Sequence, residues 1–288
     1  MTIAWLDGEL LPLEQARISP MDRGFLFGDS VYEVIPVYAG TPFRLDKHLE
    51  RLGRSLSAIG LDDPHSRNEW KEMLAALIER NGGGNLALYV QVTRGQGSKR
   101  DHAFPGADIP PTVFATVSPV DPPAADHPET ATGVSVITRD DIRWSRCDIK
   151  TTALLANVLL RQEASREGAA EAILLRDGFV TEGAASNVFV VLDGTVVTPP
   201  NSHLILPGIT RDLVIELCRE HGIAVEEREI TETQLRHADE IWLSSSTKEL
   251  VPAVRLNGHV TGDGTPGPVW KQLARHYVDF KRTLCGVS

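Results

Sequence analysis

The chain has 288 residues, 42% hydrophobic and 24% charged, so it can form one large domain or two moderate ones. Its formal net charge of −10 argues against nucleic acid or an anionic membrane as a partner. The three cysteines form no paired motif, so we expect neither a disulfide framework nor a metal site. We find no signal peptide and no apolar run long enough to span a bilayer, and we expect a cytoplasmic protein.

The first part of the chain alternates between predicted strands and helices. Apolar residues recur at helical spacing in two stretches, and alternating or β-branched runs predict strands. The predicted helices cover 45–59 and 70–78, and the predicted strands cover 3–6, 31–38, 86–93 and 113–117.

A Pro-, Ala- and Asp-rich stretch follows and indicates an interdomain linker. Pro119, Pro122 and Pro123 deny its backbone regular hydrogen bonds. We therefore predict a small N-terminal α/β domain over 1–118, a linker over 119–133 and a larger C-terminal domain over 134–288.

The C-terminal part again mixes strands and helices. Asp193-Gly194 and Asn257-Gly258 are typical of hairpin turns. The predicted helices cover 153–167, 211–220 and 270–280, and the predicted strands cover 134–138, 172–175, 188–192, 196–198 and 241–243. The fold class is mixed α/β in two domains.

Lys150 is the first candidate for chemistry. It is one of seven lysines and lies beside arginines and an apolar segment, just ahead of a predicted helix. Such surroundings favour the neutral amine that a Schiff-base lysine requires. A surface lysine, or one paired with Asp148, is the alternative.

Glu182 is the second candidate, in a small-residue segment (180–188) between two strands. Gly183 and its alanine neighbours would let a flat ring approach the backbone. The carboxylate could then keep a pyridine nitrogen protonated, which makes the ring an electron sink. A solvated turn glutamate is the alternative.

Three further segments could hold anionic groups. Residues 206–213 open a helix whose first N–H groups favour a phosphate, although a plain N-cap by Thr210 would explain the same pattern. Ser244–Thr247 supplies hydroxyls after a strand, and Arg51 shares a helix stripe with His48 and Ser55 for which a solvated face is the default.

The loop 94–104 contains glycines but neither a P-loop nor a dinucleotide-binding fingerprint. Arg100 and His102 are two residues apart and can face the same way in an extended segment. Together they could bind a carboxylate, with the arginine contacting both oxygens.

Taken together, seven segments in order resemble the fold-type IV pyridoxal-phosphate enzymes, and most closely the D-amino-acid aminotransferase branch. They are MDRGFLFGDSVYEV (21–34), HLERL (48–52), YVQVTRG (89–95), DIRWSRCDIKT (141–151), TEGAASNVF (181–189), PGITRD (207–212) and LSSSTKE (243–249). The resemblance covers nearly the whole chain and implies a C-terminal pseudo-barrel domain, with the cofactor at the domain interface.

The resemblance also implies a role for each candidate residue. Lys150 matches the Schiff-base lysine, which also moves the substrate proton, and Glu182 matches the partner of the pyridine nitrogen. The implied phosphate site comprises Arg51, Ile209, Thr210 and Ser246, with Leu206 lining the cofactor ring.

For the substrate, the resemblance implies a carboxylate trap made by Tyr32, Arg100 and His102. The last two residues would reach in from the second subunit of a homodimer. The implied reaction is ping-pong transfer of an amino group from a D-amino acid to a 2-oxo acid such as 2-oxoglutarate or pyruvate.

Several alternatives stay open. A branched-chain L-aminotransferase and an (R)-selective amine transaminase share the fold, although the Arg100-x-His102 pair argues against the first. An aminodeoxychorismate lyase, a pyridoxal-phosphate-binding protein without turnover and a plain interaction module are more remote.

Overall fold

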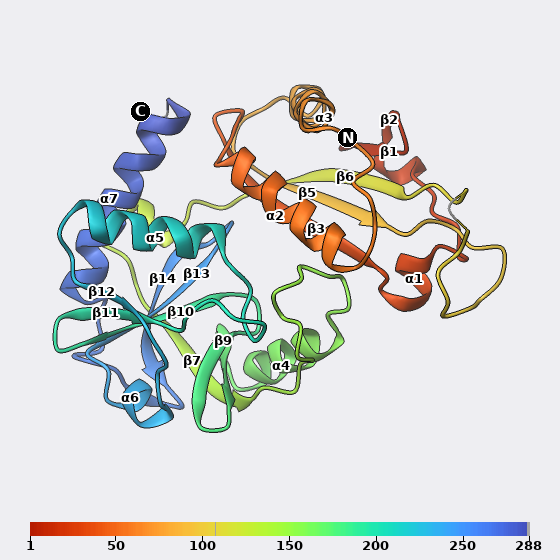
Figure 1. The fold of residues 1–288 in the computed structure, drawn as a ribbon. Helices are drawn as coiled ribbons and strands as arrows, with labels where there is room; N and C mark the ends of the chain where they lie inside the picture. Colours follow the sequence, from red (N-terminus) through yellow and green to blue (C-terminus); the bar gives the residue numbers. More distant parts are fainter. Residues whose placement is uncertain (107, 287–288) are drawn as a thin grey trace. The chain divides into compact units, whose positions relative to one another are not determined.

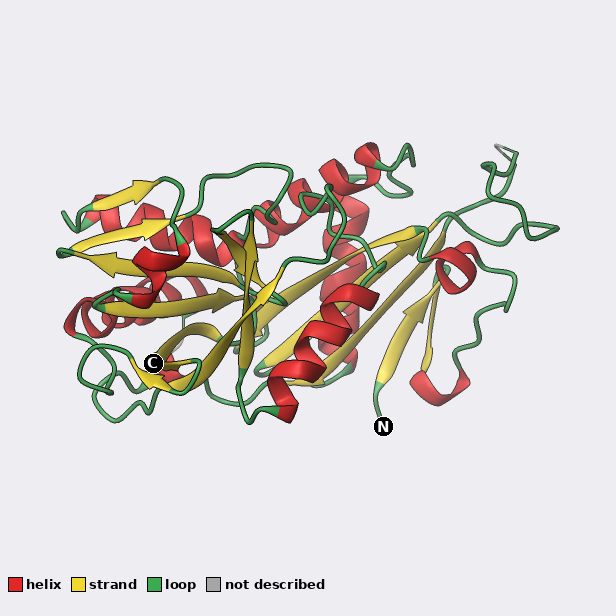
Figure 2. Cartoon of the chain, turned by 90° about the horizontal axis from the view of Figure 1, so that it is seen from below, coloured by secondary structure: helices red, strands yellow, loops and turns green. Residues whose placement is uncertain are grey.

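The computed structural model describes residues 1–106 and 108–286, which group into two compact units, each combining a sheet with helices (Figures 1 and 2). Unit 1 comprises Met1–Asp121, Ile149–Leu154 and the chain end from Cys285, and unit 2 comprises Pro122–Asp148 and Leu155–Leu284. The predicted linker over 119–133 thus lies largely within unit 2. The Lys150 segment, which the sequence assigns to the C-terminal domain, groups with unit 1.

Unit 1 is built on a six-stranded antiparallel sheet in the order β2-β1-β6-β5-β3-β4. Its strands are β1 (Ile3–Leu6), β2 (Glu9–Pro12), β3 (Ser30–Tyr38), β4 (Thr41–Pro42), β5 (Leu86–Thr93) and β6 (Thr112–Pro119). Alternate residues of β3, β5 and β6, among them Ile35, Leu88 and Ala115, are buried in one core. The sheet therefore presents one apolar face, as period-two alternation requires.

Two helices cover that face, namely α2 (Leu45–Ala58) and α3 (Arg67–Arg80). Leu52 of α2 and Trp70 of α3 are each 1% exposed within the core. A capping box between Ser66 and Glu69 begins α3, because each side chain accepts a bond from the other residue's backbone N–H. The short α1 (Arg23–Phe27) begins at Asp22, which caps Gly24, and ends at the left-handed Gly28.

The segment Ile149–Leu154 lies against the edge of β3 and is held there by backbone bonds. Tyr32 N donates to Lys150 O (2.9 Å), and Thr152 N donates to Ser30 O (3.2 Å). Ile149 is buried in the core of unit 1. Lys150 thus has a fixed backbone position beside β3, although it lies more than 100 residues away in sequence.

Unit 2 contains a nine-stranded mixed sheet in the order β12-β11-β10-β13-β14-β7-β8-β9, with β15 paired to β14. The strands are β7 (Val134–Asp140), β8 (Glu171–Arg176), β9 (Phe179–Gly183), β10 (Asn187–Leu192), β11 (Thr195–Thr198), β12 (Val225–Glu227), β13 (Glu240–Ser245), β14 (Glu249–Leu256) and β15 (His259–Val260). A side-chain bond between Glu182 of β9 and Asn187 of β10 joins strands that are far apart in this order. The sheet therefore curls back towards itself, as Figure 1 shows for β9 and β10.

Four helices accompany this sheet, namely α4 (Leu155–Arg166), α5 (Ile209–Glu220), α6 (Glu232–Arg236) and α7 (Pro268–Cys285). Leu160 and Ala164 pack α4 against β7 and β8. No helix among residues 1–106 and 108–286 is long and apolar enough to cross a membrane.

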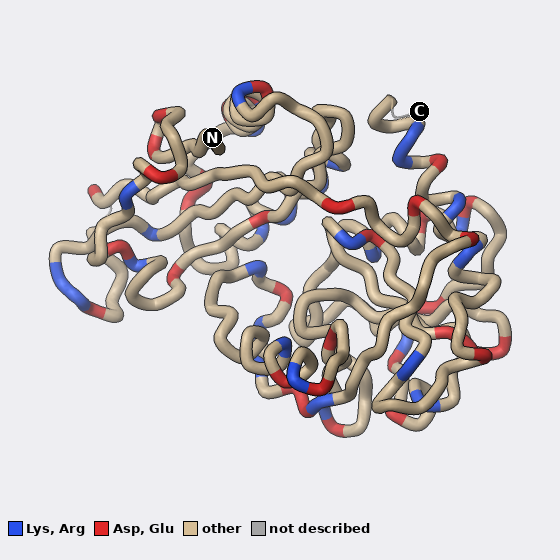
Figure 3. Tube along the Cα trace, turned by 180° about the vertical axis from the view of Figure 1, so that it is seen from behind, with Lys and Arg blue, Asp and Glu red and all other residues tan. Residues whose placement is uncertain are grey.

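Charged residues of both signs are interspersed along the trace (Figure 3). Many of them form exposed ion pairs, such as Arg67 with Asp46 and Arg228 with Glu226. Each such pair contributes only about 0–1 kcal/mol to stability. The buried ion pairs described below are therefore more informative about the site.

Every predicted strand and helix overlaps an observed element, and the main differences lie in two strands. The segment 180–183 forms most of β9 rather than a loop. The strand β14 was not predicted, because Pro252 lies at its centre and proline is rare inside central strands. The helix predicted to begin at residue 153 begins at Leu155.

Candidate active site

Lys150 lies beside an aromatic pair in unit 1. Its Nζ is 4.2 Å from the centroid of the Tyr32 ring, and Tyr32 stacks on Tyr89 with centroids 5.7 Å apart. The backbone N–H of Lys150 donates to Ser55 Oγ (3.2 Å). The side chain is partly buried. Lys150 is thus an amine with a fixed backbone and an aromatic neighbour.

The alternative partner of Lys150, Asp148, is engaged elsewhere. Its two carboxylate oxygens accept bonds from Arg146 Nε (3.0 Å) and Nη2 (3.1 Å). The pairing of Asp148 that the structure shows is thus with an arginine two residues away.

A buried ion network lies on the helix-covered face of unit 1. Arg51 donates through Nε and Nη2 to both oxygens of Glu33, each at 2.8 Å, and His48 Nδ1 contacts the same carboxylate at 2.8 Å. The solvated-face interpretation of the His48, Arg51 and Ser55 stripe is therefore wrong, since all three residues are at most 2% exposed.

Glu33 orients the Arg51 guanidinium and remains ionised. Burial opposes its ionisation, but Arg51 and His48 outweigh burial and lower the pKa of Glu33 to about 2. Burial also lowers the pKa of His48. Sequence reasoning missed Glu33, although its position on a strand facing the stripe could have indicated a partner for Arg51.

The Arg100–His102 loop lies on the surface of unit 1. Both side chains are exposed, and both contact the Phe27 ring of α1: the Arg100 guanidinium carbon lies 5.0 Å and the His102 ring centroid 5.2 Å from its centroid. The structure thus brings these two residues together on one aromatic surface.

Glu182 is the buried carboxylate of unit 2, at 5% exposure. Arg143 Nη1 donates to Oε1, while Asn187 Nδ2 (3.1 Å) and Leu206 N (3.0 Å) donate to Oε2. Burial raises the pKa of Glu182 to about 7, although Arg143 acts in the opposite direction. The solvated-turn interpretation is therefore wrong.

Arg143 and Asp141 complete this cluster and were missed by sequence reasoning. Arg143 binds Asp141 through Nε and Nη2 (both 2.9 Å), and Thr181 Oγ1 donates to Asp141 Oδ2 (3.0 Å). Burial opposes the charge of Arg143, but Asp141 and Glu182 raise its pKa. The arginine thus joins two acidic groups; its place eight residues from the next candidate gave a weak signal.

The N-terminus of α5 has no side-chain cap. Its N-cap is Gly208, and Thr210 is buried inside the first turn, so the plain N-cap interpretation of Thr210 is wrong. A Cβ at Gly208 would lie 2.0 Å from Asn187 Oδ1, so only glycine allows this close approach. First-turn N–H groups without a side-chain cap suit an anion.

Hydroxyls near the same strand ends also lack partners. Ser244 and Asn187 pair across β13 and β10, and Ser246 follows in the turn after β13. The buried Oγ atoms of Ser186 and Ser244 have no hydrogen-bond partner among the described residues. Such orphaned groups fit a polar ligand, because an unsatisfied buried hydroxyl is costly.

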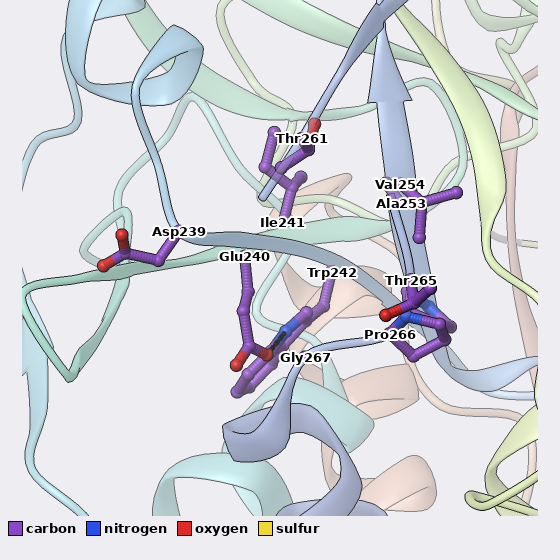
Figure 4. Close-up of a pocket in the computed structure, with 11 residues that line it drawn as sticks. Asp239, Glu240, Ile241, Trp242, Ala253, Val254, Thr261, Thr265, Pro266 and Gly267 are labelled. Atoms are coloured by element: carbon purple, nitrogen blue, oxygen red, sulfur yellow. Dashed lines mark hydrogen bonds between the residues drawn. The ribbon is translucent and has the colours of Figure 1, made fainter. Parts of the chain in front are cut away.

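A separate pocket lies at the start of α7 (Figure 4), and no predicted site residue is among the described residues that line it. Its main polar group is Glu240, whose carboxylate accepts bonds from Trp242 Nε1, Val269 N and Trp270 N, each at 2.9 Å. Glu240 thus caps the start of α7, and this pocket is structural.

The predicted residues fall into two groups. Tyr32, Arg51, Arg100, His102 and Lys150 belong to unit 1, whereas Glu182, Leu206, Ile209, Thr210 and Ser246 belong to unit 2. In the described residues no cluster of three His, Cys, Asp or Glu side chains could hold a metal ion. An amine, a buried carboxylate and an anion-binding helix end are the groups that a phosphorylated, ring-containing cofactor requires.

This fold and these groups define a class of transferases. Residues 30–256 match the family model of amino-transferase class IV, and the chain belongs to this family. A D-alanine aminotransferase of Bacillus licheniformis is 43% identical over 267 residues, which cover 93% of each chain.

Solved structures agree on the fold. The branched-chain amino acid aminotransferase of Escherichia coli superposes with a TM-score of 0.87 at 28% identity, over 96% of this chain and 93% of that one. A branched-chain enzyme from T.th., solved with N-(5'-phosphopyridoxyl)-L-glutamate, gives 0.86 at 28% identity, over 99% and 94%. The predicted family and mixed α/β fold class are confirmed.

Proposed function

We propose that this chain is a pyridoxal 5'-phosphate-dependent aminotransferase that moves the amino group of D-amino acids to a 2-oxo acid such as 2-oxoglutarate or pyruvate. The observation that carries the proposal is the 43% identity to a D-alanine aminotransferase over 93% of the chain. The cytoplasmic location remains a prediction from the sequence.

The residues of the chain fit this cofactor. Glu182 is a buried acceptor for a ring N–H, and the uncapped start of α5 suits a phosphate. Lys150 would attach the cofactor, Leu206 would line its ring, and the phosphate would be held by Arg51, Ile209, Thr210 and Ser246. When bound, the cofactor supplies an electron sink for the bond-breaking step at the substrate Cα.

The protein supplies proton transfer and orientation. Lys150 removes the Cα proton and returns it to the other side of the transferred amino group, acting as base and then as acid. Glu182 accepts the ring N–H, and Arg143 favours the ionised carboxylate that this requires. Asn187 holds Glu182 in place from the neighbouring strand.

Substrate selection rests on a carboxylate trap of Tyr32, Arg100 and His102. An arginine binds a carboxylate through two parallel bonds, so the trap fixes both the position and the handedness of the amino acid. We propose that the chain forms a homodimer and that each subunit donates Arg100 and His102 to the other. The exposure of both side chains supports this arrangement.

A branched-chain L-aminotransferase is the second candidate, because the solved structures reported above carry that name. Their 28% identity is well below the 43% of the D-alanine aminotransferase. The D-amino-acid assignment is therefore the better supported of the two.

The proposal is tested by a half-reaction screen with D-alanine, D-glutamate, L-leucine and (R)-phenylethylamine, following the visible absorbance of the cofactor. We expect conversion with the D-amino acids and loss of both chromophore and turnover in Lys150→Ala. Lys47→Ala, which removes an exposed lysine paired with Glu50, is the matched control and should behave as wild type. Fast conversion of L-leucine alone would favour the branched-chain assignment.

A further inference from the structure

The loop that carries Arg100 and His102 has little support from its own side chains. Most of residues 98–106 are exposed, including Phe104 at 64%, and the segment contains no helix. An exposed irregular loop is expected to be mobile unless other elements hold its backbone. A pair of side chains that binds a carboxylate needs such support, because recognition depends on geometry within about 0.5 Å.

Arg23 provides this support from α1. The residue is 5% exposed, and its Nη1 donates to Asp101 O (2.6 Å) and Ala103 O (3.1 Å), while Nη2 donates to His102 O (3.2 Å). One guanidinium thus binds three consecutive carbonyls in the middle of the loop. Since arginine carries five N–H donors in a rigid plane, it can make these bonds and an ion pair at once, whereas lysine cannot.

Phe27 forms the surface on which the loop side chains rest. The guanidinium carbons of Arg23 and Arg100 lie 4.9 and 5.0 Å from its ring centroid. The His102 ring packs against it at 5.2 Å. Arg23 therefore fixes the backbone of the loop beside the ring that orients both substrate-binding side chains.

Asp29 links Arg23 to the start of the loop. It accepts from Arg23 Nε (2.8 Å) and from Arg94 Nε (2.9 Å). Arg94 also donates to Ile59 O and Gly60 O, and it covers the Phe104 ring at 3.7 Å. Burial opposes the ionisation of Asp29, but the two arginines lower its pKa. If Arg23 is removed, Arg94 still pairs with Asp29, so no buried charge is left alone.

We propose that Arg23 is a positioning residue for recognition of the substrate α-carboxylate. It acts through the backbone of Asp101–Ala103 and does not contact the substrate. This inference rests on the proposed function of Arg100 and His102, and it assigns a role to an arginine that sequence reasoning did not single out.

The test compares Arg23→Gln and Arg23→Lys with wild-type holoenzyme. We expect the KM for D-alanine to rise about tenfold in Arg23→Gln, the equivalent of losing one good charge-assisted contact, with kcat changed less than about threefold. Propionate, a carboxylate without an amine, should lose inhibitory strength by the same factor. Arg23→Lys should fall between, and the cofactor absorbance should be unchanged in both variants.

The control and a second readout separate this role from general stability. Arg17→Gln removes an exposed arginine that also donates to backbone carbonyls, those of Glu14 and Ala16, and should leave KM unchanged. Hydrogen exchange should accelerate over 99–106 in Arg23→Gln and stay unchanged elsewhere in unit 1.

The outcomes are distinguishable. If wild type does not convert D-alanine, the proposed function fails, and the exchange data still report whether Arg23 orders the loop. If wild type converts D-alanine while Arg23→Gln keeps its KM and its loop exchange, the Arg23 inference alone is overturned. A fall in kcat at unchanged KM would also overturn it.

Discussion

At the residue scale, the environment of Glu182 decides what its carboxyl can do. A glutamate in water has a pKa near 4.3, and here burial raises the pKa to about 7. Arg143 opposes this shift from within hydrogen-bonding distance. The carboxyl therefore changes charge near neutral pH, and a positively charged ring N–H placed against it would favour the ionised form further.

We predict a pH-dependent affinity for pyridoxal 5'-phosphate. Only the ionised Glu182 can accept the ring N–H, so affinity should rise with pH up to about 7, by up to about tenfold per pH unit below that value. Absorbance titrations from pH 5.5 to 8.5 measure this slope.

The matched variant is Glu182→Gln, which shares every titration of the phosphate group but has no carboxyl. Its affinity should be lower and its slope shallower than in wild type. Equal slopes in the two proteins would contradict the assignment of Glu182 to the ring nitrogen.

At the element scale, local pattern predicted most helices and strands, but not which helix faces carry charge inside. The stripe His48, Arg51 and Ser55 reads as polar, and its burial follows from Glu33 on the strand that α2 covers. Periodicity describes one element at a time, so it cannot reveal a charge partner on another. The uncapped start of α5 is a similar case, since Gly208 is required by Asn187 on β10.

We predict that Gly208→Ala destabilises unit 2 and weakens cofactor binding. The φ of Gly208 is −73°, so its backbone tolerates alanine, and the cost comes from the 2.0 Å contact with Asn187 Oδ1. Overpacking of this kind costs about 1–3 kcal/mol. Urea denaturation and cofactor titration measure the two effects.

Gly53→Ala is the control for this substitution. Gly53 lies within α2, where the nearest atom to an added Cβ is 4.0 Å away, so alanine should be neutral or stabilising by about 0.4–1 kcal/mol. If both alanine variants behave alike, the close approach at Gly208 carries no energetic weight.

At the scale of the whole molecule, the two units respond to acid in opposite directions. In unit 1, the pKa of Glu33 is lowered, so its contribution to stability is present above pH 4.5 and is lost as pH falls towards about 2. The pKa of His48 is also lowered, so acid below its usual value of 6.5 favours the unfolded state. In unit 2, burial raises the pKa of Glu182 and Glu171, so a modest fall in pH below 7 favours folding there.

We therefore predict that acid loosens unit 1 first. The fall in the pKa of Glu33 from 4.5 to about 2 corresponds to about 3 kcal/mol of stability at neutral pH. Hydrogen exchange measured from pH 7 to pH 4 should accelerate in the core of unit 1 before that of unit 2.

Two variants test the cause. Glu33→Gln should be destabilised at pH 7, with a weaker dependence of its unfolding free energy on acid. Asp46→Asn, which breaks an exposed ion pair on the same helix, should change stability by less than about 1 kcal/mol. An unchanged acid response in Glu33→Gln would assign the effect to other groups.

The sequence alone determined the family, the mixed α/β class and most elements, because these follow from local periodicity, turn residues and motifs that are contiguous in the chain. Only the tertiary structure showed that Lys150 joins the edge of β3, that Arg51 is fixed by Glu33, and that Arg23 holds the loop of Arg100 and His102. Each of these contacts joins residues that are far apart along the chain or on different elements, and burial and pKa depend on such neighbours, which no local pattern specifies.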